Sequence, residues 1–313
     1  MIYKVFTLLT FTVVSVRCFS PSLNRNLPST MRAMSETSKS DAVASESSSR
    51  RDFFSITGSS VLATASLLVQ SQPSIAASID YSSAKVLVLG GSGFVGSEVC
   101  KKLKALGVDY VATSRDGRGD TKALDFTNSA VNIATEVESL AKGCTAVISC
   151  IGAINTVDDE VVNSGTGLAS LGAKAAGVKN FVYIGVAPEV RESAKGIAFL
   201  EKYLDGKQFS EDTIRSNFSS DCTIIEPTFI YGGDKFGLNP PRVADGYGNL
   251  VEGLLSSSPL RAAASISPGI IKVALEPPVK VGTVASAAVS AAFGLTQSTL
   301  DTYDKINAAS NLL

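Results

Sequence analysis

Residues 85–96 read Lys-Val-Leu-Val-Leu-Gly-Gly-Ser-Gly-Phe-Val-Gly, and this stretch decides the fold. The apolar run Lys85–Leu89 is typical of a buried parallel strand. Two overlapping glycine patterns follow it, formed by Gly90, Gly91, Ser92, Gly93, Phe94, Val95 and Gly96. Glycine allows positive φ in such a tight turn and lets a pyrophosphate approach the backbone N–H groups. Because the turn opens an amphipathic helix with Val99 and Leu103 on its apolar face, it predicts a dinucleotide-binding site.

The end of the next predicted strand indicates which dinucleotide binds. Residues 113–118 read Thr-Ser-Arg-Asp-Gly-Arg. An NAD site needs a carboxylate at this strand end for the ribose 2′-hydroxyl, whereas a 2′-phosphate needs an arginine. Arg115 can stack on the adenine and pair with that phosphate, and Ser114 can donate a hydrogen bond to it. Asp116 lies beyond the usual carboxylate position, so the sequence favours NADP(H) over NAD(H).

The rest of the chain alternates strands with helices. Strands are predicted at residues 110–113, 145–150, 180–184 and 222–226, with helices at about 130–141, 160–176, 198–216 and 281–293. This alternation is typical of a parallel sheet with helices on both faces. We therefore predict an α/β doubly wound parallel sheet, the Rossmann fold, over residues 79–313. The Gly-, Pro- and Ser-rich part at about 227–278 predicts a small C-terminal substrate lobe at the carboxyl edge of the sheet.

The first part of the chain lacks the pattern of a folded domain. Residues 1–18 hold a short apolar run after a lysine, as a signal peptide does. Residues 19–49 are serine-rich, which is typical of a transit peptide or a disordered segment. Residues 50–78 begin with two arginines before a modest apolar run, as in a twin-arginine thylakoid signal or a membrane anchor. This order resembles the presequence of algae with secondary plastids. It predicts a plastid protein, in the thylakoid lumen or associated with the membrane, with the mitochondrion as the alternative.

Composition excludes several kinds of chemistry. The chain has no histidine, which rules out a Ser-His-Asp triad and any imidazole-bound metal. Its five cysteines show no metal-ligand spacing, so we predict free buried thiols and no metal site. A net charge of −1 argues against nucleic-acid binding, which needs a basic surface. Proton transfer must therefore depend on Tyr, Lys, Asp, Glu or Cys.

From Lys85 to about Phe293 the chain resembles the atypical and extended short-chain dehydrogenases/reductases. The matching segments are VLGGSGFVG (88–96), ALDFTN (123–128), VISCIGA (147–153), VVNSGTGLASLGAKAAGVKNFVYIG (161–185), the Tyr203–Lys207 pair, EPTFIYGG (226–233) and PPVKVGTVASAAV (277–289). The chain looks most like the branch with the NADPH-binding accessory subunit of complex I, a coenzyme-Q biosynthesis protein and plastid lipid-globule-associated proteins. The resemblance implies three groups of nucleotide contacts. They are Asp125 and Phe126 near the adenine, Cys150, Ile151, Gly152 and Ala153 along the nucleotide, and Pro227 and Thr228 near the nicotinamide.

The catalytic pair of this family is Tyr-x-x-x-Lys, and the resemblance places it at Tyr203 and Lys207. Residues four apart share a face of a helix. The ammonium can therefore sit beside the phenol and lower its pKa towards the working range. In that role Tyr203 gives a proton to the substrate carbonyl, and Lys207 holds the cofactor ribose. Two other Tyr–Lys pairs share the spacing, but neither lies on a helix after the strand at 180–184.

One element of the family's site is missing. The family has Ser or Thr directly after that strand to hydrogen-bond the substrate carbonyl, whereas residues 185–188 read Gly-Val-Ala-Pro. Loss of such a donor costs about a hundredfold in rate, and Ser193 is a candidate replacement. Two functions stay open. One is a reductase of a small lipophilic carbonyl or quinone; the other is a noncatalytic scaffold or assembly factor with structural NADPH and a protein-complex partner. An epimerase ranks below both.

Three further expectations complete the analysis. Asn163 matches the family's structural asparagine, with a helix cap or an exposed polar residue as the alternatives. The charged residues between Arg191 and Glu211 predict mostly a solvated helix face. The resemblance also suggests association with a membrane or with plastid lipid globules.

Overall fold

The computed structural model describes residues 81–154, 156–233, 237–238, 241–242, 244–266, 273–296 and 299–313. They belong to one compact unit, Pro73–Leu313. The predicted signal peptide, transit segment and twin-arginine-like segment lie outside the described residues, so these remain predictions. Within the described part, no helix is both long and apolar enough to cross a bilayer.

Six parallel strands form the central sheet in the order β3-β2-β1-β4-β5-β6. Their bounds are β1 Lys85–Leu89, β2 Asp109–Ser114, β3 Lys122–Ala123, β4 Ala146–Ser149, β5 Asn180–Ile184 and β6 Cys222–Ile225. Leu87 of β1 pairs with Val111 of β2 on one side and with Val147 of β4 on the other. The strand order therefore reverses between β1 and β4, which is the topological switch point of a doubly wound sheet. The predicted fold class is confirmed.

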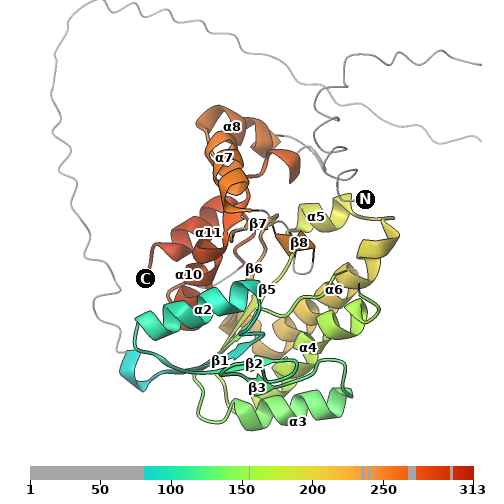
Figure 1. Cartoon of the computed structure of the whole chain (residues 1–313), viewed down its shortest axis with the longest axis vertical. Helices are drawn as coiled ribbons and strands as arrows, with labels where there is room; N and C mark the ends of the chain where they lie inside the picture. The colour runs from blue at the N-terminus through green and yellow to red at the C-terminus, as the bar shows by residue number, and fades with distance from the viewer. Residues whose placement is uncertain are drawn as a thin grey trace, which may run out of the picture. The chain divides into compact units, whose positions relative to one another are not determined.

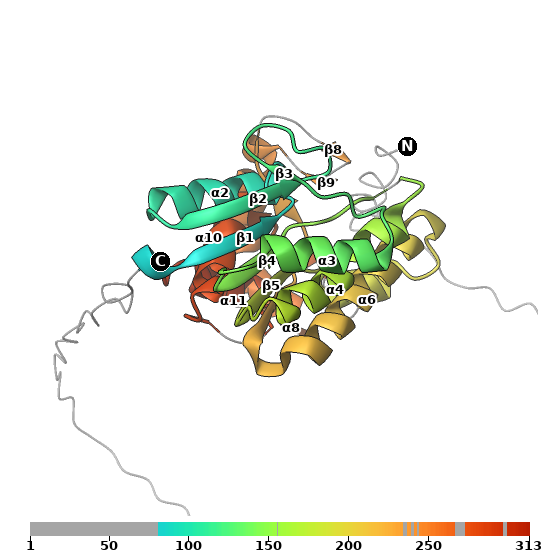
Figure 2. The ribbon, with the colours of Figure 1, turned by 90° about the horizontal axis from the view of Figure 1, so that it is seen from below.

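Helices cover both faces of this sheet (Figure 1 and Figure 2). One face carries α2 Phe94–Ala105, α10 Val281–Ala292 and α11 Tyr303–Ser310, and the other carries α3 Ala130–Leu140, α4 Asp159–Ala175 and α6 Ala198–Phe218. Val86 and Val88 of β1 pack into the first layer, and Leu87 and Leu89 pack into the second. Because both layers are buried, β1 is apolar on both sides.

The predicted long helices are confirmed to within two residues at each end. The sequence analysis missed α5, Pro188–Ser193, which follows β5. Six residues are too few to show a helical period. It also missed α11, which begins with a side-chain cap from Thr302.

A small lobe lies at the carboxyl edge of the sheet (Figure 1). Its elements are β7 Ile230–Tyr231, β8 Gly237–Leu238, β9 Pro241–Arg242, α7 Asp245–Leu255, α8 Ser258–Ile266 and β10 Val279–Lys280. The Tyr231 hydroxyl donates to Glu252 of α7, and the Tyr303 hydroxyl of α11 donates to the same carboxylate at 2.9 Å. Glu252 therefore joins the lobe to the main body. This is the small C-terminal lobe that the sequence predicts.

Candidate functional site

The glycine-rich turn joins β1 to α2 at the carboxyl edge of the sheet. Gly90 has a φ of +79°, and the Gly93 N–H donates to Gly90 O at 2.9 Å, which closes the turn. The Gly91 N–H donates to Thr113 O at 2.8 Å and fastens the turn to β2. A Cβ on Gly96 would lie 2.2 Å from Gly90 O. Only glycine therefore lets α2 start this close to the turn.

The start of α2 is suited to an anion. Gly93 is its N-cap, and no described side chain caps it. The N–H groups at the start of a twelve-residue helix, together with the helix dipole, favour a phosphate. Ser92 is exposed beside these groups. The turn from Gly90 to Gly96 thus fits the pyrophosphate that its sequence predicts.

The end of β2 forms a hydrogen-bonded turn. Ser114 Oγ accepts from the Arg118 N–H at 3.0 Å and shares a hydrogen bond with Thr121 Oγ1 at 2.6 Å. Asp116 accepts from Arg118 Nε at 2.9 Å, and this hydrogen bond lowers the pKa of the carboxyl. Arg115 is exposed. The Ser114 hydroxyl and the Asp116 carboxylate already serve the turn, whereas Arg115 lies at its surface.

The residues expected near the adenine follow β3. Asp125 Oδ1 accepts from the Thr127 N–H and from Thr127 Oγ1, both at 2.9 Å, so this carboxylate also fixes a turn. Phe126 is buried against α4, where a Cβ on Gly165 would lie 2.3 Å from its ring. The Phe126 ring belongs to the core, so a contact with a nucleotide would come from its backbone.

The segment Cys150–Ala153 continues β4 beside the glycine turn. The Cys150 N–H donates to Leu89 O at 2.9 Å, and a Cβ on Gly90 would lie 3.0 Å from Ile151 Cδ1. Asn163 of α4 donates from Nδ2 to Ala153 O at 2.7 Å and accepts from the Ala153 N–H at 3.3 Å. Asn163 is 1% exposed and lies inside α4, whose N-cap is Asp158, so the alternatives of a helix cap and an exposed polar residue are wrong. It holds the segment that contacts Lys207.

The Tyr203–Lys207 pair lies on α6. Lys207 is 3% exposed, and its Nζ donates to Ile151 O at 2.8 Å and to Ile184 O at 2.9 Å. These carbonyls follow β4 and end β5, so the amine bridges two strand ends. Nζ lies 5.9 Å from the centroid of the Tyr203 ring. A Cβ on Gly152 would lie 3.6 Å from Nζ. The structure thus brings Lys207 to the segment expected along the nucleotide, with Tyr203 one turn away on the same helix.

Burial controls the protonation of this pair. It lowers the pKa of Lys207 to about 7, and it raises the pKa of Tyr203 above its usual value. Arg191 lowers the pKa of both groups, but burial outweighs it at Tyr203. The prediction that Lys207 brings the Tyr203 pKa down is therefore wrong for the protein without nucleotide. The phenol stays protonated at neutral pH, which is the state that a proton donor needs.

The segment after β5 runs beside the end of β6. The Ala187 N–H donates to Pro227 O at 3.4 Å. The hydroxyls of Thr228 and Ser193 are buried and lack partners in the described part of the chain. Thr228 lines a small hollow with Glu189, Val273 and Glu276. No described hydrogen bond joins either hydroxyl to Tyr203 or Lys207, so no described contact ties Ser193 or Thr228 to the pair.

A buried ionic cluster beside the pair was missed in the sequence. Arg191 of α5 forms ion pairs with Glu211 of α6 and, at 2.8 Å, with Glu226 at the end of β6. Glu211 also pairs with Arg215 at 2.9 Å. Burial, with the nearby Glu211 charge, raises the pKa of Glu226 to about 7. The predicted solvated face is wrong at Arg191, Lys207 and Glu211. The predicted topology could have indicated this cluster, because it brings the three segments that carry Arg191, Glu211 and Glu226 to the same edge of the sheet.

The described cysteines are free thiols. Cys144 and Cys222 are buried, and Cys100 and Cys150 are partly buried. Burial raises the pKa of all four. The prediction of free buried thiols is confirmed for Cys144 and Cys222, whereas Cys100 and Cys150 are free but only partly buried.

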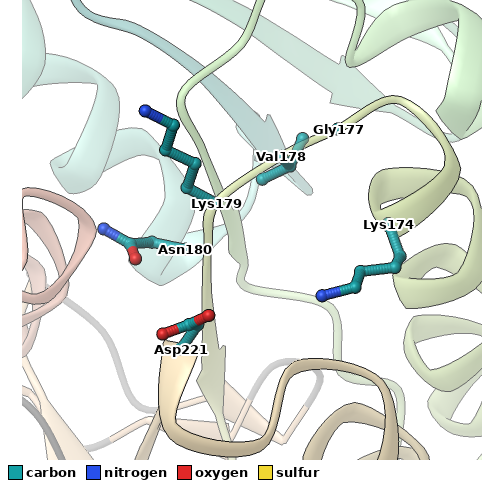
Figure 3. Close-up of a pocket in the computed structure, with 6 residues that line it drawn as sticks. All are labelled: Lys174, Gly177, Val178, Lys179, Asn180 and Asp221. Atoms are coloured by element: carbon teal, nitrogen blue, oxygen red, sulfur yellow. The ribbon is translucent and has the colours of Figure 1, made fainter.

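A separate hollow of about 450 Å³ lies at the opposite edge of the sheet. It surrounds the turn from α4 to β5 and is lined by Lys174, Gly177, Val178, Lys179, Asn180 and Asp221. Figure 3 shows Lys174 and Lys179 pointing in different directions from this turn. Strands of doubly wound sheets carry their ligands at the carboxyl ends, and this hollow lies at the amino ends of β5 and β6. It is therefore not the candidate dinucleotide site.

Comparison with known proteins agrees with the dinucleotide site that the glycine turn predicts. A family profile described as NAD(P)H-binding matches residues 90–247. That range begins at Gly90 and includes Tyr203 and Lys207. An uncharacterised chloroplastic protein of Arabidopsis thaliana is 29% identical over 229 residues, which cover 68% of this chain and 72% of that protein.

Two solved structures are given as examples of those to which this chain is similar. The Bordetella bronchiseptica enzyme WbmH in complex with NAD+ is 16% identical, with a TM-score of 0.46, over 69% of this chain and 74% of that one. The dTDP-4-dehydrorhamnose reductase of Bacillus anthracis in complex with NADP is 14% identical, with a TM-score of 0.45, over 69% and 73%.

Proposed function

The chain belongs to the NAD(P)H-binding family, and from this premise we propose an NADP(H)-dependent reductase of a small lipophilic carbonyl or quinone in the plastid. The observation that carries the proposal is Lys207, buried with its Nζ between Ile151 O and Ile184 O. A buried titratable group with a strongly shifted pKa is typical of a functional site. Tyr203 lies one helical turn away, as the reductase pair requires.

The residues fit the roles that this reaction needs. The glycine turn and the start of α2 would hold the pyrophosphate, and Lys207 would hold the nicotinamide ribose. When bound, NADPH supplies the hydride. Tyr203 is protonated at neutral pH and would give its phenolic proton to the substrate carbonyl oxygen. A protonated Lys207 would then stabilise the phenolate that Tyr203 leaves behind.

The preference for NADP(H) rests on the end of β2. Arg115 is exposed and can approach a 2′-phosphate. The competing carboxylate, Asp116, accepts a hydrogen bond from Arg118. Asp116 is therefore less available to the 2′-hydroxyl of NAD(H).

The plastid and the lipophilic substrate rest on separate observations. The composition of residues 1–78 predicts a plastid leader, and the Arabidopsis relative is chloroplastic; the mitochondrion is the alternative. The α7 helix exposes Leu250 and Leu254 to 71% and 64%. Exposed apolar side chains on a lobe at the ligand-binding edge suit a lipophilic substrate or a lipid surface.

A second candidate is a noncatalytic scaffold or assembly factor with structural NADPH and a protein partner. The observation that favours it is the segment 185–188, which has no hydroxyl to hold a substrate carbonyl. In this function the buried Lys207 would clamp the ribose without taking part in chemistry.

Nucleotide binding and turnover separate the two candidates. The purified protein is titrated with NADPH and NADH while nicotinamide fluorescence is followed. Oxidation of NADPH is then measured with menadione as the quinone and decanal as the lipophilic aldehyde. Rapid NADPH exchange with turnover supports the reductase. Release over hours without turnover supports the scaffold, and absence of binding by either nucleotide contradicts both.

A further inference from the structure

The peptide N–H of Val186 points away from β6. The N–H groups of its neighbours Gly185 and Ala187 donate to Ile225 O at 2.8 Å and to Pro227 O at 3.4 Å. In an extended segment, successive peptide groups point to alternate sides. The Val186 N–H therefore points to the opposite side, towards the end of β4.

That side of the segment also carries the contact with Lys207. The carbonyl of Ile184, two residues before Val186, points the same way and accepts from Lys207 Nζ at 2.9 Å. The same Nζ donates at 2.8 Å to Ile151 O, which follows β4. The Val186 N–H and the Lys207 amine thus lie along one gap between the ends of β4 and β5.

This N–H has no acceptor among the described residues. Val186 is 5% exposed, and its N–H makes neither a backbone nor a side-chain hydrogen bond in the described part of the chain. Unpaired buried N–H groups are rare because they lose their hydrogen bond to water without a replacement. A ligand oxygen in the gap would complete it.

We propose that the Val186 N–H is the second hydrogen-bond donor to the substrate carbonyl oxygen, replacing the side-chain hydroxyl that residues 185–188 lack. The inference rests on the proposed reductase function, because the donor acts on the carbonyl that is reduced. A backbone N–H aimed at a developing oxyanion stabilises the transition state as a hydroxyl does. The amide keeps its hydrogen, and the transferred proton still comes from Tyr203.

Arg191 is the positioning residue for this segment. It lies on α5, directly after the segment, and its guanidinium contacts Glu211 of α6 and Glu226 at the end of β6. Its side chain is 17% exposed, and that of Glu226 is 3% exposed. Because buried ion pairs are costly to break, this cluster fixes the segment between α6 and β6. The cluster thereby ties α5, which begins two residues after Val186, to α6, which carries Lys207.

An ester at position 186 tests the donor directly. Nonsense suppression with α-hydroxyisovaleric acid replaces the Val186 N–H by oxygen and keeps the side chain. With menadione, kcat is expected to fall by about a hundredfold, while the NADPH dissociation constant stays within about threefold. The same ester at Val131, a 75% exposed valine of α3, is the matched control and should keep the wild-type rate.

Variants of Arg191 test the positioning without altering the peptide. R191M should lower kcat with little change in NADPH affinity, and R191K should recover part of the loss. R215M removes the other arginine that pairs with Glu211 but not the arginine on α5, so it should lower kcat less than R191M does.

Each outcome bears on a different statement. Wild-type kcat in the Val186 ester overturns the donor while turnover by the wild type still supports the reductase. If the ester fails to fold, the Arg191 series decides, and an R191M rate equal to that of R215M overturns the inference. A wild-type protein that binds NADPH but reduces neither menadione nor decanal contradicts the proposed function and this inference together.

Discussion

The two halves of the candidate site are built from different parts of the chain. At the ends of β1 and β2, the nucleotide half is made of backbone: a left-handed Gly90, a Gly96 that no side chain can replace, and the first N–H groups of α2. At the ends of β4, β5 and β6, the chemical half depends on buried side chains. Lys207 and Arg191 come from two helices and meet groups on three strand ends.

This difference separates binding from chemistry. The backbone half is fixed by steric limits that hold in any environment. The side-chain half is set by burial, which moves the pKa of Lys207 to about 7. Substitutions at the glycines of the first half should therefore abolish nucleotide binding, and substitutions of the proton-transferring side chains in the second should change rate and pH dependence while binding persists.

The largest effect is expected from G96V. Its Cβ would lie 2.2 Å from Gly90 O, a backbone atom that cannot move without opening the turn. NADPH affinity should fall by at least about a hundredfold, or ~2.7 kcal/mol, in a fluorescence titration. The matched control is G282A at the start of α10, where an added Cβ meets nothing within 4 Å. If G96V binds NADPH normally, the turn does not hold the pyrophosphate.

The next largest effect is expected from Y203F, in the chemical half. Removing the phenolic hydroxyl takes away the proton donor, so kcat with menadione should fall by about a hundredfold. NADPH affinity should stay within about threefold, because the nucleotide half is untouched. Unchanged turnover would remove Tyr203 from the mechanism and leave the scaffold as the better function.

The same contrast explains how much could be predicted from sequence. The glycine turn, β1 and α2 were predicted because their signals lie within twelve consecutive residues. The individual strands and the long helices were predicted from their apolar patterns, whereas the strand order was seen only in the structure. α5 was missed because six residues carry no period, although it holds the only arginine that contacts both Glu211 and Glu226 in the described structure.

The candidate site could be predicted in part. Tyr203, Lys207 and Asn163 were found through family motifs. In the structure, Lys207 and Asn163 both contact the segment that follows β4. The direction of the Tyr203 pKa was predicted wrongly, because spacing on a helix reveals a neighbouring charge but not the depth of burial. The Arg191 cluster and the unpaired Val186 N–H depend on contacts between distant segments, which no local pattern encodes.

A smaller effect is expected from pH, through Lys207. Its pKa is about 7 in the folded protein and about 10.4 in an unfolded chain. Between these values the unfolded chain holds more protons, so stability should rise with pH and be lost as pH falls towards 7. The gain in Tm from pH 7 to pH 9 should be several degrees smaller in K207M than in the wild type. Equal pH slopes would mean that Lys207 is charged in the folded protein at both pH values.

The smallest effect is expected from R115A, which tests the choice between the two cofactors within the nucleotide half. Arg115 is exposed at the end of β2, so its removal should not disturb the turn held by Ser114 and Thr121. If its guanidinium meets the 2′-phosphate, NADPH should bind about tenfold more weakly, as expected for one partly solvated charge-assisted hydrogen bond. NADH affinity should be unchanged, because NADH has no such phosphate. R118A makes the opposite change: Arg118 pairs with Asp116, so its loss frees that carboxylate for the 2′-hydroxyl, and NADH affinity should rise. An equal loss of both nucleotides in R115A would show that Arg115 acts on the adenine or the turn, and the preference for NADP(H) would then lack its main support.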